Sequence, residues 1–563
     1  MTDSRSSLYP ELTRPAGKDP AGPLDEALYD LVEARFERLL RDNPILATSV
    51  GLHEYDAELG DGSVDALLGE LETEKAHLGM IESLDPAGLS PEARIERELE
   101  IHNLRASNFD TEGLRTWERR SVALDTIGDG LFLLFARDHA PLADRLEAIA
   151  GRLEAVPTYL AQSRSRARVP QVRLWQGLEI ESAGHLPSLF DDIVAAGDGV
   201  LGEREAHRLE RAADGAKIAV AEYRGWLHDS LATGSDDWAS GRERHDEIVG
   251  LRAFDGLDSD AILELGWQRL AEEKAARVAA AHEIDPDADE TTVLDRVKSD
   301  HPPTFTAALD AYRDAILRAR THVIEQNLVS VPDDERIEVI ETPEYLRNVL
   351  PFAAYFAPAK FDLSPKGIYV VTPAVGDAAG AMREHNFASI SNTSIHEAYP
   401  GHHLQLSVAA KHPSLTRVLT DAPEFVEGWG MYSELMMREH GFDADARYRL
   451  TLHTDAIWRA CRIILDVRMH RGELSVDEAT RFLVEHTGFE ESNARAEVQW
   501  YTYRPTYPMS YLLGRTLLLA LRDDEQRRLG DRFDLKAFHD TLLRNGSLPI
   551  SFHRRLLAGA EGA

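Results

Sequence analysis

The chain has 563 residues, of which 43% are hydrophobic, so it is long enough and apolar enough to bury a large core. Its formal net charge is −35, spread along the chain, and a surface of that sign repels phosphate backbones, so no nucleic-acid partner is expected. The one cysteine, Cys461, can form neither an internal disulfide nor a thiolate metal site.

The first 24 residues are polar and rich in proline and glycine, and they contain no apolar stretch typical of an export signal. We expect a flexible lead-in at 1–24. No apolar run approaches the ~20 residues that span a bilayer, so no membrane partner is expected. The expected location is cytoplasmic.

From residue 25 onward the sequence predicts helices, because apolar residues recur at spacings of three and four with charges between them. No fixed-period repeat interrupts this pattern, so a solenoid is not supported. The predicted helical segments are 28–40, 95–104, 142–159, 207–231, 260–281 and 305–323.

The pattern changes near residue 330. Residues 336–341 alternate polar and apolar side chains, as a half-buried strand does, and 367–373 form a second predicted strand that Pro373 ends. A loop rich in glycine and alanine follows at 374–381. The fold class is therefore mainly α with one small β-sheet, and we expect the strand at 368–372 to accept an extended peptide as an added strand.

We expect a helical lobe at 25–330 and a metal-bearing lobe at 331–563, packed as one continuous domain around a deep cleft. The richest group of polar side chains begins just after the predicted sheet.

A histidine-rich segment carries the chemistry, with His396, Glu397, His402 and His403. In the H-E-x-x-H pattern, two histidines one helical turn apart bind zinc, and the glutamate accepts a proton from water. Here the spacing does not suit an unbroken helix. His402 would lie about 9 Å along the axis from His396 on another face, and His403 would lie on the same face about 10.5 Å away.

Pro400 and Gly401 offer a break between these histidines. Proline lacks the N–H and would clash with the carbonyl of His396, and glycine tolerates unusual dihedrals. If two residues are looped out, His402 takes the place of the second zinc ligand. The alternative is a helix that ends at Pro400, with both later histidines as polar loop residues.

The next helical stretch supplies two candidate carboxylates, Glu427 and Glu434, which are seven residues apart and share a face. A catalytic zinc needs three protein ligands and one open position. Apolar neighbours such as Phe425 and Met431 suggest burial, where an unpaired carboxylate is costly. The alternative is a pair of surface glutamates on an acidic protein.

Arg462, Asp466 and His470 form a polar stripe at a spacing of four on an otherwise apolar helix. Ion pairing along the helix explains the stripe, and so does an arrangement in which Asp466 orients His470 toward a site.

The segment 500–511 contains four tyrosines and Arg504. Tyrosine hydroxyls can donate to an oxyanion, and arginine can hold a substrate carboxylate. Aromatic core packing is the alternative explanation.

Two strings, HEAYPGHHLQ at 396–405 and EGWGMYSELM at 427–436, resemble the DUF885 family of bacterial proteins. That family is similar in fold to the M32 carboxypeptidases, which are helical zinc peptidases with H-E-x-x-H motifs. The resemblance covers most of the chain and includes residues 43–56 and 367–372.

The resemblance implies specific roles. Gly401 and His402 match the Gly-His of the peptidase pattern, which favours His402 over His403 as the second ligand. Glu397 would be the general base and Glu427 the third ligand. Asp466 and His470 also recur as a pair in the family, whereas Trp500, Tyr507 and Leu512 depart from its pattern in the segment expected to bind substrate.

The predicted function is a zinc metallohydrolase that cleaves amide bonds, most directly a carboxypeptidase-like peptidase. The alternatives are a non-peptide amidase or esterase at the same centre, and a catalytically inactive relative that binds peptides or metabolites. The expected cofactor is one catalytic Zn²⁺, and the expected partners are a peptide or small amide substrate and a second copy in a homodimer.

The predicted metal ligands are His396, His402 and Glu427. The predicted catalytic residues are Glu397, with Tyr501, Tyr511 or His470 at the oxyanion. The predicted supporting or substrate-binding residues are His403, Glu434, Asp466, Arg462, Arg504 and Tyr507.

Overall fold

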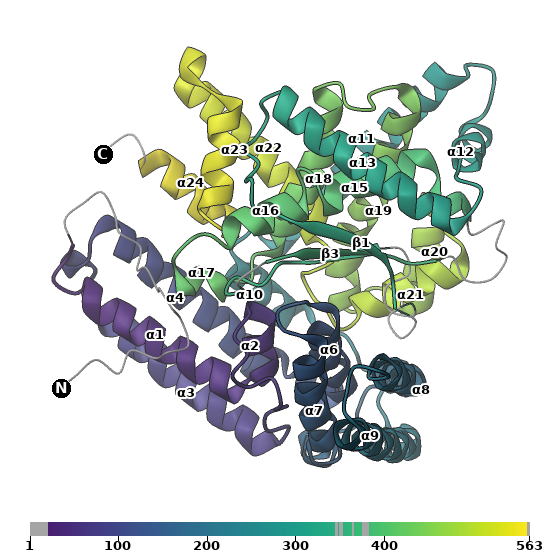
Figure 1. The fold of residues 1–563 in the computed structure, drawn as a ribbon. Helices are drawn as coiled ribbons and strands as arrows, with labels where there is room; N and C mark the ends of the chain where they lie inside the picture. Colours follow the sequence, from purple (N-terminus) through teal and green to yellow (C-terminus); the bar gives the residue numbers. More distant parts are fainter. Residues whose placement is uncertain (1–20, 344–346, 348–352, 363–364, 374–381, 560–563) are drawn as a thin grey trace.

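The computed structural model describes residues 21–343, 347, 353–362, 365–373 and 382–559. The described chain is mainly helical with one small sheet, which confirms the predicted fold class (Figure 1). The predicted lead-in at 1–24 lies mostly outside the described residues, and the loop at 374–381 lies wholly outside them. Among the helices described, none is both long and apolar enough to cross a membrane.

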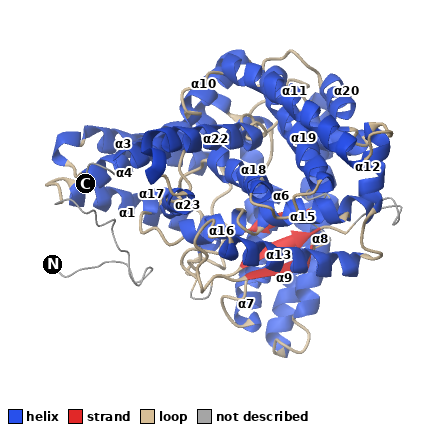
Figure 2. Cartoon of the chain, turned by 90° about the horizontal axis from the view of Figure 1, so that it is seen from above, coloured by secondary structure: helices blue, strands red, loops and turns tan. Residues whose placement is uncertain are grey.

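The α-helices surround the sheet on all sides in the view of Figure 2. Their bounds are α1 Asp25–Asp42, α2 Pro44–Val50, α3 Val64–Ser83, α4 Pro91–Phe109, α5 Thr116–Arg119, α6 Ala123–Ala136, α7 Leu142–Ser163, α8 Arg173–Ala196, α9 Glu203–Ser230, α10 Arg242–Arg252, α11 Ser259–Ile284, α12 Glu290–Ser299, α13 Phe305–Glu325, α15 Phe387–Glu397, α16 His402–Ala409, α17 Leu415–Val418, α18 Pro423–Glu439, α19 Ala446–His470, α20 Val476–Thr487, α21 Glu491–Tyr501, α22 Ser510–Leu529, α23 Leu535–Arg544 and α24 Ile550–Gly559.

All six helical segments predicted from periodicity are helices: α1, α4, α7, α9, α11 and α13. In α1 the periodic residues Leu28, Val32 and Phe36 form the buried face, as the spacing predicts. Side-chain caps begin several of these helices. Ser90 accepts a hydrogen bond from Ala93 N in α4, and Asp258 accepts one from Ala261 N in α11.

The sheet has three strands in the order β1-β3-β2: β1 (Ile337–Glu341), β2 (Ala353–Phe356) and β3 (Gly367–Val371). β3 pairs in parallel with β1 and antiparallel with β2, and its residue Tyr369 faces Val339 on one side and Tyr355 on the other. Both predicted strands are confirmed. The expectation that the strand at 368–372 accepts a peptide is wrong, because β3 is the central strand and neighbours on both sides already satisfy its backbone.

The largest core gathers apolar residues from Val249 to Leu557 and is centred on α18, α19 and α22. It includes residues on both sides of position 330, because α11 packs along α19. The two helices are so close that a methyl group added at Gly266 of α11 would lie 2.8 Å from Ile463 of α19. A second core lies among α6 to α9, and a third around α1. The predicted lobe boundaries and the cleft between them stay predictions.

Two glycines bring α18 and α22 into backbone contact. A Cβ at Gly514 would sit 1.8 Å from the carbonyl oxygen of Glu424, and one at Gly428 would sit 2.5 Å from the carbonyl carbon of Gly514. This close approach fixes the helix that carries Glu427 against the helix that carries Tyr511.

Candidate metal centre

The chain breaks its helix between the two histidines of the candidate centre. α15 ends at Glu397 and α16 begins at His402, with a cis peptide between Tyr399 and Pro400. Gly401 N donates to the carbonyl of Ile395 at 3.0 Å, so the turn folds back against α15. A Cβ at Gly401 would sit 1.8 Å from the carbonyl oxygen of His396, so this close approach requires glycine. The distortion predicted at Pro400 and Gly401 is therefore present.

The break brings His396 and His402 together with Glu427 of α18. Their ligand atoms all lie within 4.8 Å of one another. Oε2 of Glu427 is 3.5 Å from Nε2 of His396 and 3.3 Å from Nε2 of His402. The two rings are inclined by 87° with centroids 4.7 Å apart. The Nε2 atom of each ring faces the same carboxylate oxygen, Oε2 of Glu427.

Further side chains hold two of these three residues in place. Nδ1 of His396 lies 2.7 Å from Oε1 of Glu434, and Asn392 donates to the other oxygen of Glu434 at 2.9 Å. The hydroxyl of Tyr507 donates to Oε1 of Glu427 at 2.7 Å. A carboxylate behind a ligand histidine fixes its tautomer and orientation, which is the arrangement found around protein-bound zinc.

The electrostatics of the group favour a positive charge at its centre. Burial lowers the pKa of His396, but hydrogen bonds to Glu427 and Glu434 outweigh that effect and raise it to about 10. Burial raises the pKa of Glu427, but the two histidines hold it well below its usual range. Two imidazoles and one carboxylate are a donor set that zinc accepts, so the residues present fit the predicted ion.

Glu397 is the last residue of α15, directly after His396. Burial raises the pKa of its carboxyl group, and the charge of Glu427 adds to the rise, while His396 and His402 oppose it. The carboxyl group therefore lies within the field of all three candidate ligands and holds a proton more readily than an exposed glutamate.

A sequence model for a family described as bacterial proteins of unknown function, DUF885, matches residues 44–557. The chain belongs to the DUF885 family. No curated protein matches the sequence.

Two solved structures share the fold of this DUF885 chain. One is a protein of unknown function from Shewanella oneidensis, proposed to be a lipoprotein; it is 22% identical with a TM-score of 0.76, over 94% of this chain and 99% of that one. The other, from Colwellia psychrerythraea and also proposed to be a lipoprotein, is 17% identical with a TM-score of 0.82, over 95% and 99% of the two chains. At these identities the similarity shows the fold alone. The similarity to M32 carboxypeptidases stays a prediction.

His403 does not face the three candidate ligands of the DUF885 chain. Its Nδ1 lies 2.8 Å from the hydroxyl of Tyr355 on β2, and its Nε2 lies 2.9 Å from Oε2 of Glu335. Both ring nitrogens are therefore engaged elsewhere. The geometry agrees with His402, rather than His403, as the second ligand.

Some tyrosines of the 500–511 segment contact the candidate ligands, and others lie beside them. Tyr507 contacts Glu427 directly, and the ring of Tyr511 stacks against His396 at a centroid distance of 6.4 Å. Tyr501 instead donates to Glu497 at 2.8 Å and accepts from Arg462 at 3.2 Å, so its hydroxyl and that guanidinium belong to a buried polar network.

Two further predicted site residues lie away from these contacts. Arg504 is exposed, and no contact with the candidate ligands is described for it. Nε2 of His470 donates to the carbonyl of Tyr501 at 3.0 Å, and Ser240 N donates to its Nδ1 at 3.4 Å. Each nitrogen therefore has a partner on the backbone.

The predicted contact between Asp466 and His470 needs correction. Asp466 lies 2.8 Å from Nε2 of His245 and accepts hydrogen bonds from Thr506 N at 3.1 and 3.0 Å. Its carboxylate thus fixes the backbone of the 500–511 segment, and not the ring of His470. The physical reason is that α10, remote in sequence, places His245 against α19.

Three polar residues near the centre were not among the predicted site residues: Asn392, Asp455 and Arg459. Asn392 donates to Asp455 at 2.8 Å as well as to Glu434, and burial raises the pKa of Asp455 to about 6. Burial acts to raise the pKa of Glu397 and of Glu434, and the charge of Arg459 opposes that effect in both. A signal existed for Asn392, which precedes His396 by four residues and so shares its helix face.

Proposed function

We propose that this protein is a zinc-dependent hydrolase of amide bonds, with peptides as its substrate class. One observation supports the proposal above all: two histidines separated by a broken helix converge with a glutamate of another helix, and a further, half-buried glutamate directly follows the first histidine. Three protein ligands leave one coordination position for water or substrate, as a catalytic zinc requires.

His396, His402 and Glu427 would hold the ion, and zinc in such a site supplies a Lewis acid that activates water and polarises a carbonyl. Glu397 is the residue that accepts the proton of the attacking water and returns it to the leaving nitrogen. Burial suits Glu397 to this exchange, because the raised pKa of its carboxyl group moves toward neutral pH, where a general base works best.

Glu434 and Tyr507 have positioning roles in this proposal. Glu434 keeps a proton on Nδ1 of His396, which leaves Nε2 free to face the ion, and Tyr507 holds the carboxylate of Glu427. Tyr511 is the better candidate to donate to an oxyanion, because its ring stacks beside His396. Tyr501 and His470 are bonded elsewhere and are weaker candidates.

The experiment is hydrolysis of a panel of dipeptides, N-acylated amino acids and esters by protein purified without chelators, with zinc measured in the same samples. Cleavage of peptides supports the proposal, and cleavage of the other compounds alone would replace peptides with a non-peptide amide or ester. Glu397→Gln should lower turnover by about 10²–10⁴-fold and keep its zinc. Glu485→Gln, a change at an exposed acid, is the control.

Loss of zinc in Glu397→Gln would show that Glu397 is a ligand and not the base. Zinc-loaded protein that cleaves none of these compounds but binds peptides would be an inactive relative. The cytoplasmic location and the homodimer stay predictions, which cell fractionation and sedimentation would test. The two related structures come from proteins proposed to be lipoproteins, so fractionation should include the membrane fraction.

A further inference from the structure

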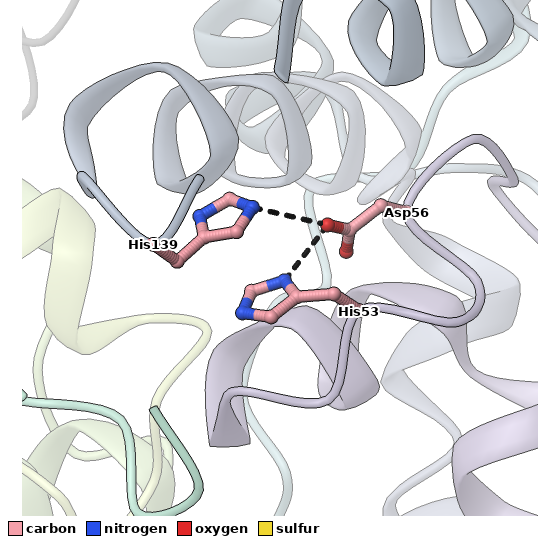
Figure 3. Close-up of side chains that lie close together, drawn as sticks. All are labelled: His53, Asp56 and His139. Carbon is pink, nitrogen blue, oxygen red and sulfur yellow. Dashed lines mark hydrogen bonds and ion pairs between the residues drawn. The ribbon is translucent and has the colours of Figure 1, made fainter. Parts of the chain in front are cut away.

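A second group of two histidines and one carboxylate lies in the N-terminal half of the chain: His53, Asp56 and His139 (Figure 3). Oδ2 of Asp56 is 2.8 Å from Nδ1 of His53 and 3.4 Å from Nε2 of His139. His53 and Asp56 follow α2, and His139 follows α6, so two separate loops meet at this point. Each of the three residues offers one ligand atom within 4.8 Å of the others.

The surroundings of this group repeat those of the candidate metal centre. The other nitrogen of His53, Nε2, lies 3.0 Å from Oδ1 of Asp362, as Nδ1 of His396 lies against Glu434. The other oxygen of Asp56 accepts a hydrogen bond from the hydroxyl of Thr48 at 2.6 Å, as Glu427 accepts one from Tyr507. In both groups, therefore, a carboxylate backs one histidine and a hydroxyl holds the ligand carboxylate.

The group is also electrostatically suited to a cation. Asp56 and Asp362 flank His53 on either side, and the nearest described guanidinium nitrogen, from Arg152, is 3.9 Å from Asp56. Nδ1 of His139 is buried without a described hydrogen-bond partner, and the described contact of its other nitrogen is with the carboxylate of Asp56.

We propose that His53, Asp56 and His139 form a second site for a divalent cation with a preference for nitrogen and oxygen ligands, such as Zn²⁺ or Co²⁺. The ion would join the loops that follow α2 and α6. Through Asp362 it would also tie both loops to the connection between β2 and β3. This inference does not depend on the proposed hydrolase activity.

Binding requires a small rearrangement. The rings of His53 and His139 are parallel within 3° with centroids 3.6 Å apart. An imidazole binds a metal in the plane of its ring, so the two planes must tilt apart for both to contact one ion. The ion-bound structure should therefore show the two rings inclined to each other.

The test is a Co²⁺ titration of chelator-treated full-length protein, followed by calorimetry and visible absorbance, with bound metal counted by mass spectrometry. The wild type should bind two equivalents, and His139→Gln and His396→Gln should each bind one. The double variant should bind none. His207→Gln, at an exposed histidine of α9, is the control and should bind two.

Asp362→Asn should keep both sites but weaken the second by about 10–100-fold, and it remains informative if His139→Gln does not fold. Equal binding by wild type and His139→Gln, or unchanged affinity in Asp362→Asn, would overturn the inference. That result would leave His53 as a hydrogen-bonded link between Asp56 and Asp362. One equivalent in the wild type that is lost in His139→Gln but kept in His396→Gln would support this second site while removing the proposed catalytic one.

Discussion

His396 of α15 and Glu434 of α18 are 38 residues apart in sequence, and their buried side chains form a hydrogen bond of 2.7 Å. The bond determines which nitrogen of His396 carries the proton and so which one can face Glu427 and His402. It links the predicted ligand to Glu434, which the sequence predicted as a supporting or substrate-binding residue on the same helix face as Glu427.

Glu434→Gln tests this bond. The amide cannot accept the proton of Nδ1 as strongly as a carboxylate does, so we expect zinc affinity to fall by about 10–100-fold. Competition with a chromophoric chelator measures the affinity directly. Glu439→Gln, on the same helix but exposed and paired with Arg522, should leave it unchanged. Equal affinities for the two variants would mean that Glu434 does not orient the ring.

Gly430→Ala should disturb the centre without replacing a ligand. A Cβ at this position would lie 2.6 Å from Cε1 of His396, so the ring must move. A displacement of about 1 Å in a catalytic group costs about 100-fold in rate, and we expect a loss of that order in any hydrolysis detected, together with weaker zinc binding. Gly225→Ala, in open space on α9, is the matched control and should leave both unchanged. Full activity in Gly430→Ala would show that His396 is not held where the structure places it.

Two tyrosine variants separate residues at the centre from residues beside it. Tyr507→Phe removes the hydrogen bond to Glu427, so zinc affinity should fall by about 10-fold. Tyr501→Phe removes bonds to Glu497 and Arg462 and should cost about 1 kcal/mol of stability while zinc affinity stays the same. Zinc competition and thermal unfolding measure the two effects. The opposite pattern would reverse the roles assigned to the two hydroxyls.

Acid should destabilise the fold through His470. Burial lowers the pKa of this histidine to about 4, whereas an exposed histidine in the unfolded chain titrates near 6.5. The unfolded state therefore binds more protons below pH ~6.5, and stability falls as the pH drops from about 6.5 to 4, by up to ~1.4 kcal/mol per pH unit. His470→Gln should be less stable at pH 7 but should lose less stability on acidification. Denaturant unfolding at pH 6.5, 5.5 and 4.5 measures how steeply the stability of the wild type and of His470→Gln falls with pH. Equal slopes for the two proteins would contradict the lowered pKa of His470.

The sequence predicted local features of the fold well. Periodicity located six helices, alternation located β1, and an apolar run that ends at Pro373 located β3, because each pattern reflects the burial of a single element. The break between His396 and His402 followed from Pro400 and Gly401, since the restrictions of those residues act within a few positions.

Relationships between distant segments could not be predicted in this way. β2 is short and carries no alternating pattern, so the central position of β3 was not foreseen. The pairing of Asp466 with His245 joins residues 221 positions apart. His53 and His139 likewise meet only because two loops fold together, and no spacing in the sequence marks that contact.

The burial of the candidate ligands restricts the shape of any molecule that binds them. His396, His402 and Glu427 expose only 6–7% of their surface. A folded protein presents a broad surface, whereas a chain terminus or a small amide is narrow, so the burial of these atoms favours narrow substrates. Within the proposed function, free ends and short compounds are therefore the first substrates to try.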